Sequence, residues 1–207
     1  MLQQVTLEIT TVGSEGQGIG RLNGMAVFVP GALPGETVKV ELVTRKKSYL
    51  EAQLVEVLEP SPQRVIPKCP YFGMCGGCQL QHIDYAGECS VKEESVVSAV
   101  RRIGKQQTPV RPILFAESFW RYRNRANFHL QKVRNHFLVG FYAEGSHQVV
   151  DLKDCLLLPE GFCDIAHGIA EDLAAAGFFE MKTICLRQNQ QGQITVLLTG
   201  SPEASSL

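Results

Sequence analysis

The first sixty residues alternate apolar and polar side chains in short runs that are separated by turns rich in glycine and proline. Alternation with a period of two is typical of a half-buried strand. The predicted strands are VTLEIT (5–10), MAVFVPG (25–31), TVKVELV (37–43) and LEAQLVEVLEP (50–60), and GSEGQGIG (13–20) is interpreted as a barrel turn. Strands at this spacing predict a small β-barrel.

Three prolines, at positions 60, 62 and 67, mark a boundary after the barrel. Ser90 and Glu93 have the spacing of a capping box and predict a helix that ends at Gly104. Its predicted apolar stripe is Val96, Val97, Val100 and Ile103. We therefore expect a barrel over residues 1–62, a mixed α/β domain over 63–200 and a tail over 201–207.

Strand patterns return after residue 110 and surround one more helical pattern. A helix is predicted over 160–176, with the stripe Phe162, Ile165, Ile169 and Leu173 and an end at Gly177. The predicted strands are VRPILF, RANFHLQKV, FLVGFY, HQVVDL, KTICLRQ (182–188) and QITVLLTG (193–200). The predicted fold class is α+β, with an OB-like barrel followed by a mixed α/β domain.

The amino-acid composition indicates only the general class of the protein and its expected location in the cell. Apolar residues make up 44% and charged residues 20% of the chain, which is ordinary for a globular protein. No run of eighteen apolar residues predicts a membrane span, and the N-terminus has no signal-peptide pattern. We expect a cytoplasmic monomer without a membrane partner.

Three of the seven cysteines lie in CPYFGMCGGCQLQH (69–82), with the spacing Cys69-x5-Cys75-x2-Cys78. Cytosolic thiols stay reduced, so the cluster indicates metal binding or catalysis more than disulfides. Three thiols in one loop with a distant fourth favour an iron–sulfur cluster, and Gly76 and Gly77 let the backbone approach it. A zinc site and three reduced core cysteines are the alternatives.

The fourth ligand has to come from the other cysteines, which are Cys89, Cys155, Cys163 and Cys185. Cys89 lies at the start of the predicted helix, and Cys163 and Cys185 fall inside regular elements, where a small buried thiol is common. Cys155 follows a strand, at an element boundary where a side chain can point back toward a loop.

Basic residues concentrate in one block. Residues 101–134 hold nine basic side chains and one acid, Glu117, which gives a net charge of +8 within a chain of net charge −1. Arg121, Arg123 and Arg125 share one face if FWRYRNRANFHL (119–130) is a strand. We interpret this arginine ladder as an RNA contact; the alternative is a solvated face. In the barrel, Arg45, Lys46, Lys47 and Tyr49 are candidate RNA contacts or a solvated loop.

CPYFGMCGGCQLQH, FWRYRNRANFHL and VGFYAEGSHQVVDLKDC (139–155) resemble the RNA uracil-5 methyltransferases, most closely the iron–sulfur-containing 23S ribosomal RNA branch. The resemblance implies an N-terminal TRAM domain, RNA as partner, and a 4Fe-4S cluster on Cys69, Cys75, Cys78 and Cys155. No spacing of the five histidines suggests a metal site. His82 lies near the cysteines in sequence, and neutral packing or a hydrogen bond to a cluster ligand is expected rather than ligation.

Members of that family continue into a Rossmann-like domain that binds S-adenosylmethionine (SAM) and carries the catalytic residues. No glycine-rich loop of that type follows a strand after residue 150. We therefore expect that the SAM domain is missing, that no catalytic or SAM-binding residue lies in this chain, and that the chain is inactive alone. The alternatives are a stand-alone RNA-binding protein and a zinc-bound interaction module.

Overall fold

The computed structural model describes residues 3–13 and 15–201, which form two compact units. One unit, here the barrel unit, comprises the described residues of 1–68 together with 79–115. The other, here the sheet unit, comprises 69–78 and the described residues from 116 onward. The two units therefore alternate along the chain and do not divide at residue 62. The assignment of residues 1–62 to RNA binding and of residues 63–200 to an iron–sulfur domain stays a prediction.

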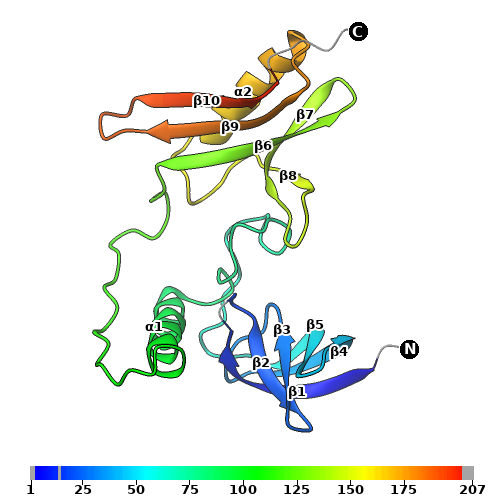
Figure 1. Ribbon diagram of the computed structural model, residues 1–207, viewed down its shortest axis with the longest axis vertical. Helices are drawn as coiled ribbons and strands as arrows, with labels where there is room; N and C mark the ends of the chain where they lie inside the picture. The colour runs from blue at the N-terminus through cyan, green and yellow to red at the C-terminus, as the bar shows by residue number, and fades with distance from the viewer. Residues whose placement is uncertain (1–2, 14, 202–207) are drawn as a thin grey trace. The chain divides into compact units, whose positions relative to one another are not determined.

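The barrel unit contains the predicted closed barrel (Figure 1). Its strands are β1 (Gln4–Val12), β2 (Gly18–Leu22), β3 (Met25–Val29), β4 (Thr37–Arg45) and β5 (Tyr49–Glu59), in the order β1-β2-β3-β5-β4. Only the β3–β5 pair is parallel. Alternate side chains fill the interior; the fully buried ones include Ile9, Val27, Val29, Val38 and Val40.

Strand β2 was not predicted, because its glycines read as a turn. A Cβ atom at Gly18 would lie 2.7 Å from the carbonyl oxygen of Ala32, and one at Gly20 would lie 2.7 Å from that of Glu8. Real Cβ atoms do not approach this closely, so the strand needs glycine at both positions to pack against its neighbours. The predicted turn at 13–20 therefore covers the start of a strand.

A buried ion pair fastens the chain that leaves the barrel. Glu36 is fully buried and accepts hydrogen bonds from the amides of Leu33 (2.9 Å) and Ser61 (3.2 Å). It also accepts two from Arg64, at 2.5 and 2.8 Å. Burial raises the pKa of Glu36, but these donors outweigh it and the net pKa is lowered. The carboxylate thus stays charged and paired, as a buried charge must.

Helix α1 (Tyr85–Arg102) begins earlier than the capping box predicted. Its N-cap is Asp84, whose carboxylate accepts the amide of Gly87 at 2.7 Å. Ser90 lies inside the helix and donates to the carbonyl of Ala86, so the predicted capping box is wrong. Asp84 is an equally good capping residue placed one and a half turns earlier. Of the predicted stripe, Val96 is 52% and Ile103 83% exposed.

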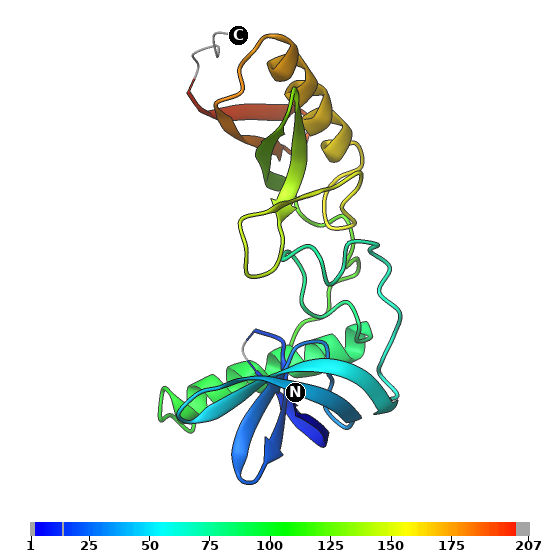
Figure 2. The same cartoon turned by 90° about the vertical axis from the view of Figure 1, so that its right-hand side faces the viewer.

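The sheet unit is an antiparallel five-stranded sheet with one helix on one face (Figure 2). The strands are β6 (Arg125–Val133), β7 (His136–Tyr142), β8 (Val149–Asp151), β9 (Met181–Gln188) and β10 (Ile194–Gly200), in the order β10-β9-β6-β7-β8. Helix α2 (Phe162–Ala175) covers the face from which Phe128, Ile184 and Leu186 project, and its predicted stripe packs into that core.

The strand predicted over VRPILF is wrong. Residues 105–117 form no regular element in the structure, and Leu114 and Phe115 are 93% and 63% exposed. Pro109 and Pro112 remove two amide donors from this segment, which prevents regular strand pairing. None of the helices among the described residues is long and apolar enough to span a membrane.

We predict opposite stability effects for alanine at two glycines of the sheet unit. A Cβ at Gly140 would lie 1.9 Å from the carbonyl oxygen of Val150, so Gly140→Ala should destabilise the unit by about 2 kcal/mol through overpacking. Gly168 lies inside α2 with open space around it, so Gly168→Ala should stabilise the unit by about 0.5–1 kcal/mol. Urea unfolding of both variants measures this; equal effects would contradict the register of β7 and β8.

Candidate metal and RNA-binding sites

The cysteine loop (Cys69–Cys78) belongs to the sheet unit, although α1 follows it in the sequence. The amide of Gly76 donates to the carbonyl of Tyr142 at 2.9 Å, and the amide of Lys153 donates to the hydroxyl of Tyr71 at 3.0 Å. Cys75 also forms a β-bridge with Ala143. These contacts fasten the loop to the ends of β7 and β8, and the chain after β8 leads to Cys155.

The thiols of Cys69, Cys75, Cys78 and Cys155 influence one another electrostatically. Burial raises the pKa of Cys75, and negative charge on Cys78 and Cys69 raises it further. Burial likewise raises the pKa of Cys155, and so does charge on the same two cysteines. The predicted distant ligand, Cys155, therefore belongs to the same unit as the three loop thiols.

Backbone amides point at two of these sulfurs. The amide of Gly77 opposes the burial effect and lowers the pKa of Cys75, and the amides of Leu157 and Leu158 do the same for Cys155. A Cβ at Gly77 would lie 3.4 Å from the Cys75 sulfur. No three or more His, Cys, Asp or Glu side chains in the described part of the chain are arranged to hold a metal ion.

The other three cysteines lie in regular elements, and one of them, Cys163, is affected by charge on Cys155. Cys89 is buried in α1 of the barrel unit, and Cys185 is half-buried in β9. Cys163, at the start of α2, is 3% exposed, and burial raises its pKa to about 12. A thiol with that pKa is protonated at neutral pH, which matches the predicted role of a packed core residue.

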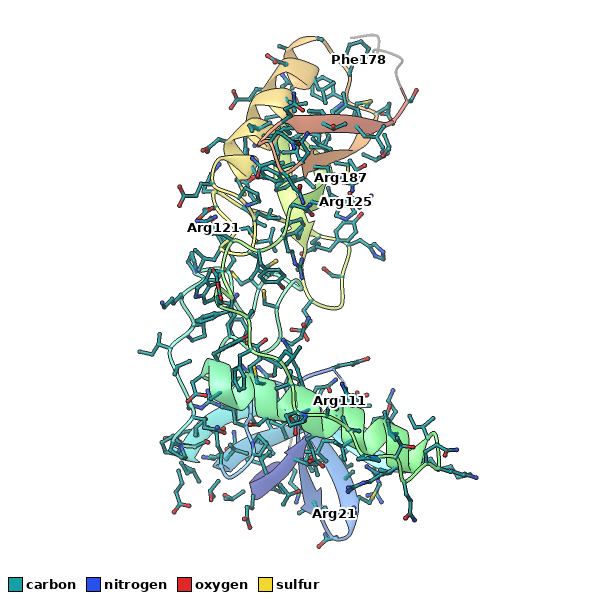
Figure 3. All side chains as sticks on the ribbon, turned by 90° about the vertical axis from the view of Figure 1, so that its left-hand side faces the viewer. Arg21, Arg111, Arg121, Arg125, Phe178 and Arg187 are labelled. Atoms are coloured by element: carbon teal, nitrogen blue, oxygen red, sulfur yellow. The ribbon has the colours of Figure 1, made fainter. Side chains whose placement is uncertain are left out.

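The predicted arginine ladder is wrong, because β6 begins only at Arg125. Arg121 has a φ of 55°, outside the strand region, and its guanidinium pairs with Asp154. Figure 3 shows Arg121 on the other side of the sheet unit from Arg125. Arg123 is exposed and lies close enough to Cys75 to lower the pKa of that thiol.

A different basic pair lies on the open face of the sheet. Arg125 of β6 and Arg187 of β9 are register partners, so they share one face, opposite the core residue Phe128. Figure 3 shows the two side chains next to each other. Both are exposed, and neither forms an ion pair with a carboxylate among the residues that the structure describes. The sequence analysis did not identify Arg187 as a candidate RNA contact. The alternation of apolar and polar residues in KTICLRQ could have placed it on the exposed face of a strand.

Aromatic rings continue this open face. His129 follows Arg125 on the same side of β6, and its ring stacks on Tyr142 with centroids 3.8 Å apart. Tyr142 also makes an edge contact with His147. Burial and the nearby His147 lower the pKa of His129, so its ring is neutral at pH 7. The open face thus combines two guanidinium groups with stacked planar rings.

Three basic residues of the barrel unit lie together where β4 turns into β5. Arg45, Lys46 and Lys47 are exposed, and the amide of Lys46 donates to the carbonyl of Tyr49 at 2.9 Å. The Tyr49 ring packs edge-on against Phe28 at a centroid distance of 5.3 Å. The hairpin holds three cations beside an aromatic ring, as predicted; RNA contact by these residues stays a prediction.

His82 lies in the barrel unit, not with the thiols of the sheet unit. It is 3% exposed, and burial together with the charge of Arg64 lowers its pKa to about 4, although Glu36 opposes this. Its carbonyl accepts the amide of Val65, so it fixes the chain after the cysteine loop to the segment after the barrel. His82 is thus a neutral buried histidine, which agrees with the expectation of neutral packing.

Comparison with known proteins begins with the barrel: residues 3–55 match the family model of the TRAM domain. An uncharacterized RNA methyltransferase of Caldanaerobacter subterraneus is 41% identical over 75% of this chain and 34% of its own length. The 23S rRNA (uracil(1939)-C(5))-methyltransferase RlmD of Shewanella amazonensis is 35% identical over 99% of this chain and 47% of its own length.

A solved structure has the same fold over nearly the whole chain. The tRNA (uracil-54, C5)-methyltransferase of Pyrococcus abyssi, in complex with S-adenosyl-L-homocysteine, matches with a TM-score of 0.61 and 21% identity over 95% of this chain and 46% of that one. The barrel thus matches the TRAM domain. Across both units the chain is similar to RNA methyltransferases, among them a uracil-C5 methyltransferase. It spans about a third to a half of the length of these curated relatives.

We predict that buried His82 makes the barrel unit lose stability as pH falls. The folded-state pKa of about 4 lies below the ordinary value of 6.5, so the unfolded chain binds the extra proton first. Stability is fully present above pH 6.5 and should decline by up to about 3 kcal/mol as pH falls toward 4.

The test is urea unfolding between pH 5 and 7.5, above the range in which Glu36 titrates. His82→Gln should flatten the dependence of the unfolding free energy on pH. His136→Gln, at an exposed histidine of the sheet unit, should leave it unchanged. A wild-type profile that is flat over this range would contradict a neutral buried His82.

Proposed function

We propose that this chain is the RNA-binding and iron–sulfur portion of a SAM-dependent 23S rRNA uracil-5 methyltransferase that acts in the cytoplasm. The observation that carries the proposal is the 35% identity to an RlmD enzyme along 99% of this chain, which includes both the barrel and the sheet unit. The TRAM match over residues 3–55 supports the assignment of the barrel to RNA binding.

The open face of the sheet supports RNA as the partner. Like charges on directly opposed strands destabilise a sheet, and Arg125 and Arg187 are opposed, with no ion pair to a carboxylate among the described residues. A phosphate between them would remove that repulsion and accept bidentate hydrogen bonds. The stacked His129 and Tyr142 rings offer a surface for an unpaired base. The Arg45–Tyr49 hairpin supplies a second cationic surface on the barrel unit.

The chemistry explains why such an enzyme needs extensive RNA contacts. Uracil C5 is buried in a stacked helix, so the base has to be flipped out, which costs a few kcal/mol. Phosphate and stacking contacts at other nucleotides supply that energy. In the complete enzyme, SAM provides the methyl group. The residues of this chain bind and orient the RNA; we assign no catalytic residue to them.

The thiol site supports a 4Fe-4S cluster held by Cys69, Cys75, Cys78 and Cys155. Four thiols are the ligand set of such clusters, and amide N–H groups directed at the sulfurs stabilise them and tune their potential. The amide of Gly77 lowers the pKa of Cys75, and those of Leu157 and Leu158 lower the pKa of Cys155. We therefore infer an iron–sulfur cluster with a structural or RNA-positioning role, since methyl transfer needs no electron; the ligand set is the one that the sequence resemblance implies.

We predict about four irons and four sulfides per chain when the protein is purified without oxygen. Cys155→Ser should lower the iron content to three or fewer per chain, because it removes one ligand. Cys185→Ser, at a half-buried thiol of the same unit, should keep the full content. Iron and sulfide analysis with visible absorption measures this; a colourless wild-type chain with one zinc would disprove the cluster.

We predict that Arg125→Gln/Arg187→Gln lowers the affinity for a 23S rRNA fragment by about tenfold. The slope of log K against log salt should also become shallower, by about one for each lost phosphate contact. Lys153→Gln/Lys182→Gln removes the same charge from other positions of the sheet unit and should leave the slope nearly unchanged. Equal slopes in both double variants would exclude the open face as an RNA site.

A further inference from the structure

Arg121 makes an unusual number of contacts with the turn that carries Cys155. Its Nη1 and Nη2 atoms bind the two carboxylate oxygens of Asp154 at 2.8 and 2.6 Å. Nη1 also donates to the carbonyl oxygens of Cys155 (2.8 Å) and Leu158 (3.0 Å). One guanidinium thus joins both ends of the four-residue segment that begins at the thiol residue.

The backbone around Arg121 follows the same turn. The amide of Arg121 donates to the carbonyl of Leu156 at 2.8 Å, and the amide of Arg123 donates to that of Leu157 at 2.9 Å. Arg121 itself has a φ of 55°, a conformation that non-glycine residues adopt only when the surroundings hold them there. With these bonds the carbonyls of four successive residues, from Cys155 to Leu158, all accept hydrogen bonds from the Arg121–Arg123 segment.

This arrangement also fixes the turn's amides. When the carbonyls of residues 155–158 are held, the peptide planes between them cannot rotate. The amide of Leu158 donates to the carbonyl of Cys155 at 2.9 Å, which closes the turn. The guanidinium holds the carbonyls of both residues, so it fixes the backbone from which the Cys155 side chain projects. Its side chain is 29% exposed, and both of its terminal nitrogens donate within the turn.

We propose that Arg121 is the positioning residue for the distant thiol: it holds the Cys155–Leu158 turn so that the sulfur faces the loop thiols and can complete a four-thiolate site. The inference rests on the proposed iron–sulfur function. It assigns Arg121 to the metal site, and it removes Arg121 from the predicted RNA contacts. Arginine is required here because its planar guanidinium binds both oxygens of a carboxylate and two carbonyls at the same time. The single ammonium group of lysine cannot make this set of contacts.

The test compares variants that separate the guanidinium geometry of Arg121 from its charge. Arg121→Lys keeps the charge and loses the guanidinium, and Arg121→Gln loses both. Asp154→Asn keeps the contacts of Arg121 with the two carbonyls but removes its ion pair with Asp154. Arg123→Gln is the control, because it removes a cation near a thiol and leaves in place the backbone amide of residue 123 that binds the Leu157 carbonyl. Thermal unfolding by circular dichroism identifies any variant that fails to fold, and Asp154→Asn is the mildest of the three.

The first readout is the rate at which a chelator removes iron from anaerobically purified protein. Loss of partners that orient metal ligands typically weakens metal binding 10–100-fold, so we expect Arg121→Lys and Arg121→Gln to lose iron about tenfold faster than wild type. Asp154→Asn should lie between, and Arg123→Gln should match wild type. The spectrum of the reduced cluster by electron paramagnetic resonance should change in both Arg121 variants and stay constant in Arg123→Gln.

The second readout needs no metal. In protein prepared without iron, hydrogen exchange of the Leu157 and Leu158 amides should be faster in Arg121→Lys than in Arg123→Gln. Wild-type iron retention and exchange in Arg121→Lys would overturn the positioning role. A wild-type chain without iron would instead disprove the proposed cluster, and the exchange result would then still decide whether Arg121 holds the turn.

Discussion

The structure depends on fastening a ten-residue loop to a turn that lies almost eighty positions further along the chain. Apolar packing and hydrogen bonds both hold the loop. Tyr71 and Cys75 pack against the core of the sheet unit, the amide of Gly76 donates to the carbonyl of Tyr142, and the amide of Lys153 donates to the hydroxyl of Tyr71. Arg121 holds the turn that carries Cys155. The loop and this turn are thus fixed to the same sheet.

The sequence predicted the barrel, α2 and most strands of the second sheet, because alternation and helical stripes record burial directly. It failed where backbone contacts decide the structure. Gly18 and Gly20 resemble a turn in sequence, yet they form a strand because neighbouring carbonyls leave no room for a Cβ. Ser90 and Glu93 have capping-box spacing, yet Asp84 begins the helix. Two capping signals within one turn and a half cannot be ranked without the tertiary contacts.

In the candidate sites, too, local sequence patterns predicted some features, and tertiary contacts decided the others. Cysteine spacing identified the thiol loop, and its partner Cys155 was preferred because it follows a strand. The arginines were misassigned, since period-two reasoning holds only inside a strand and the strand begins at Arg125. The left-handed backbone at Arg121 has no sequence signature, because arginine rarely adopts it. Arg187 escaped notice because its importance comes from register with β6, which no local pattern reveals.

The short segment from Arg121 to Arg125 therefore serves two sites with neighbouring residues. At Arg121 the chain turns, and the side chain points at the Cys155 turn. Four residues later the chain has entered β6, and Arg125 projects from the open face beside Arg187. A shift in the Cys155 turn would pull on Arg121 and thus on the start of β6. The proposed cluster and RNA surface would then be linked through five residues of backbone, which gives the proposed cluster a physical route to affect RNA binding.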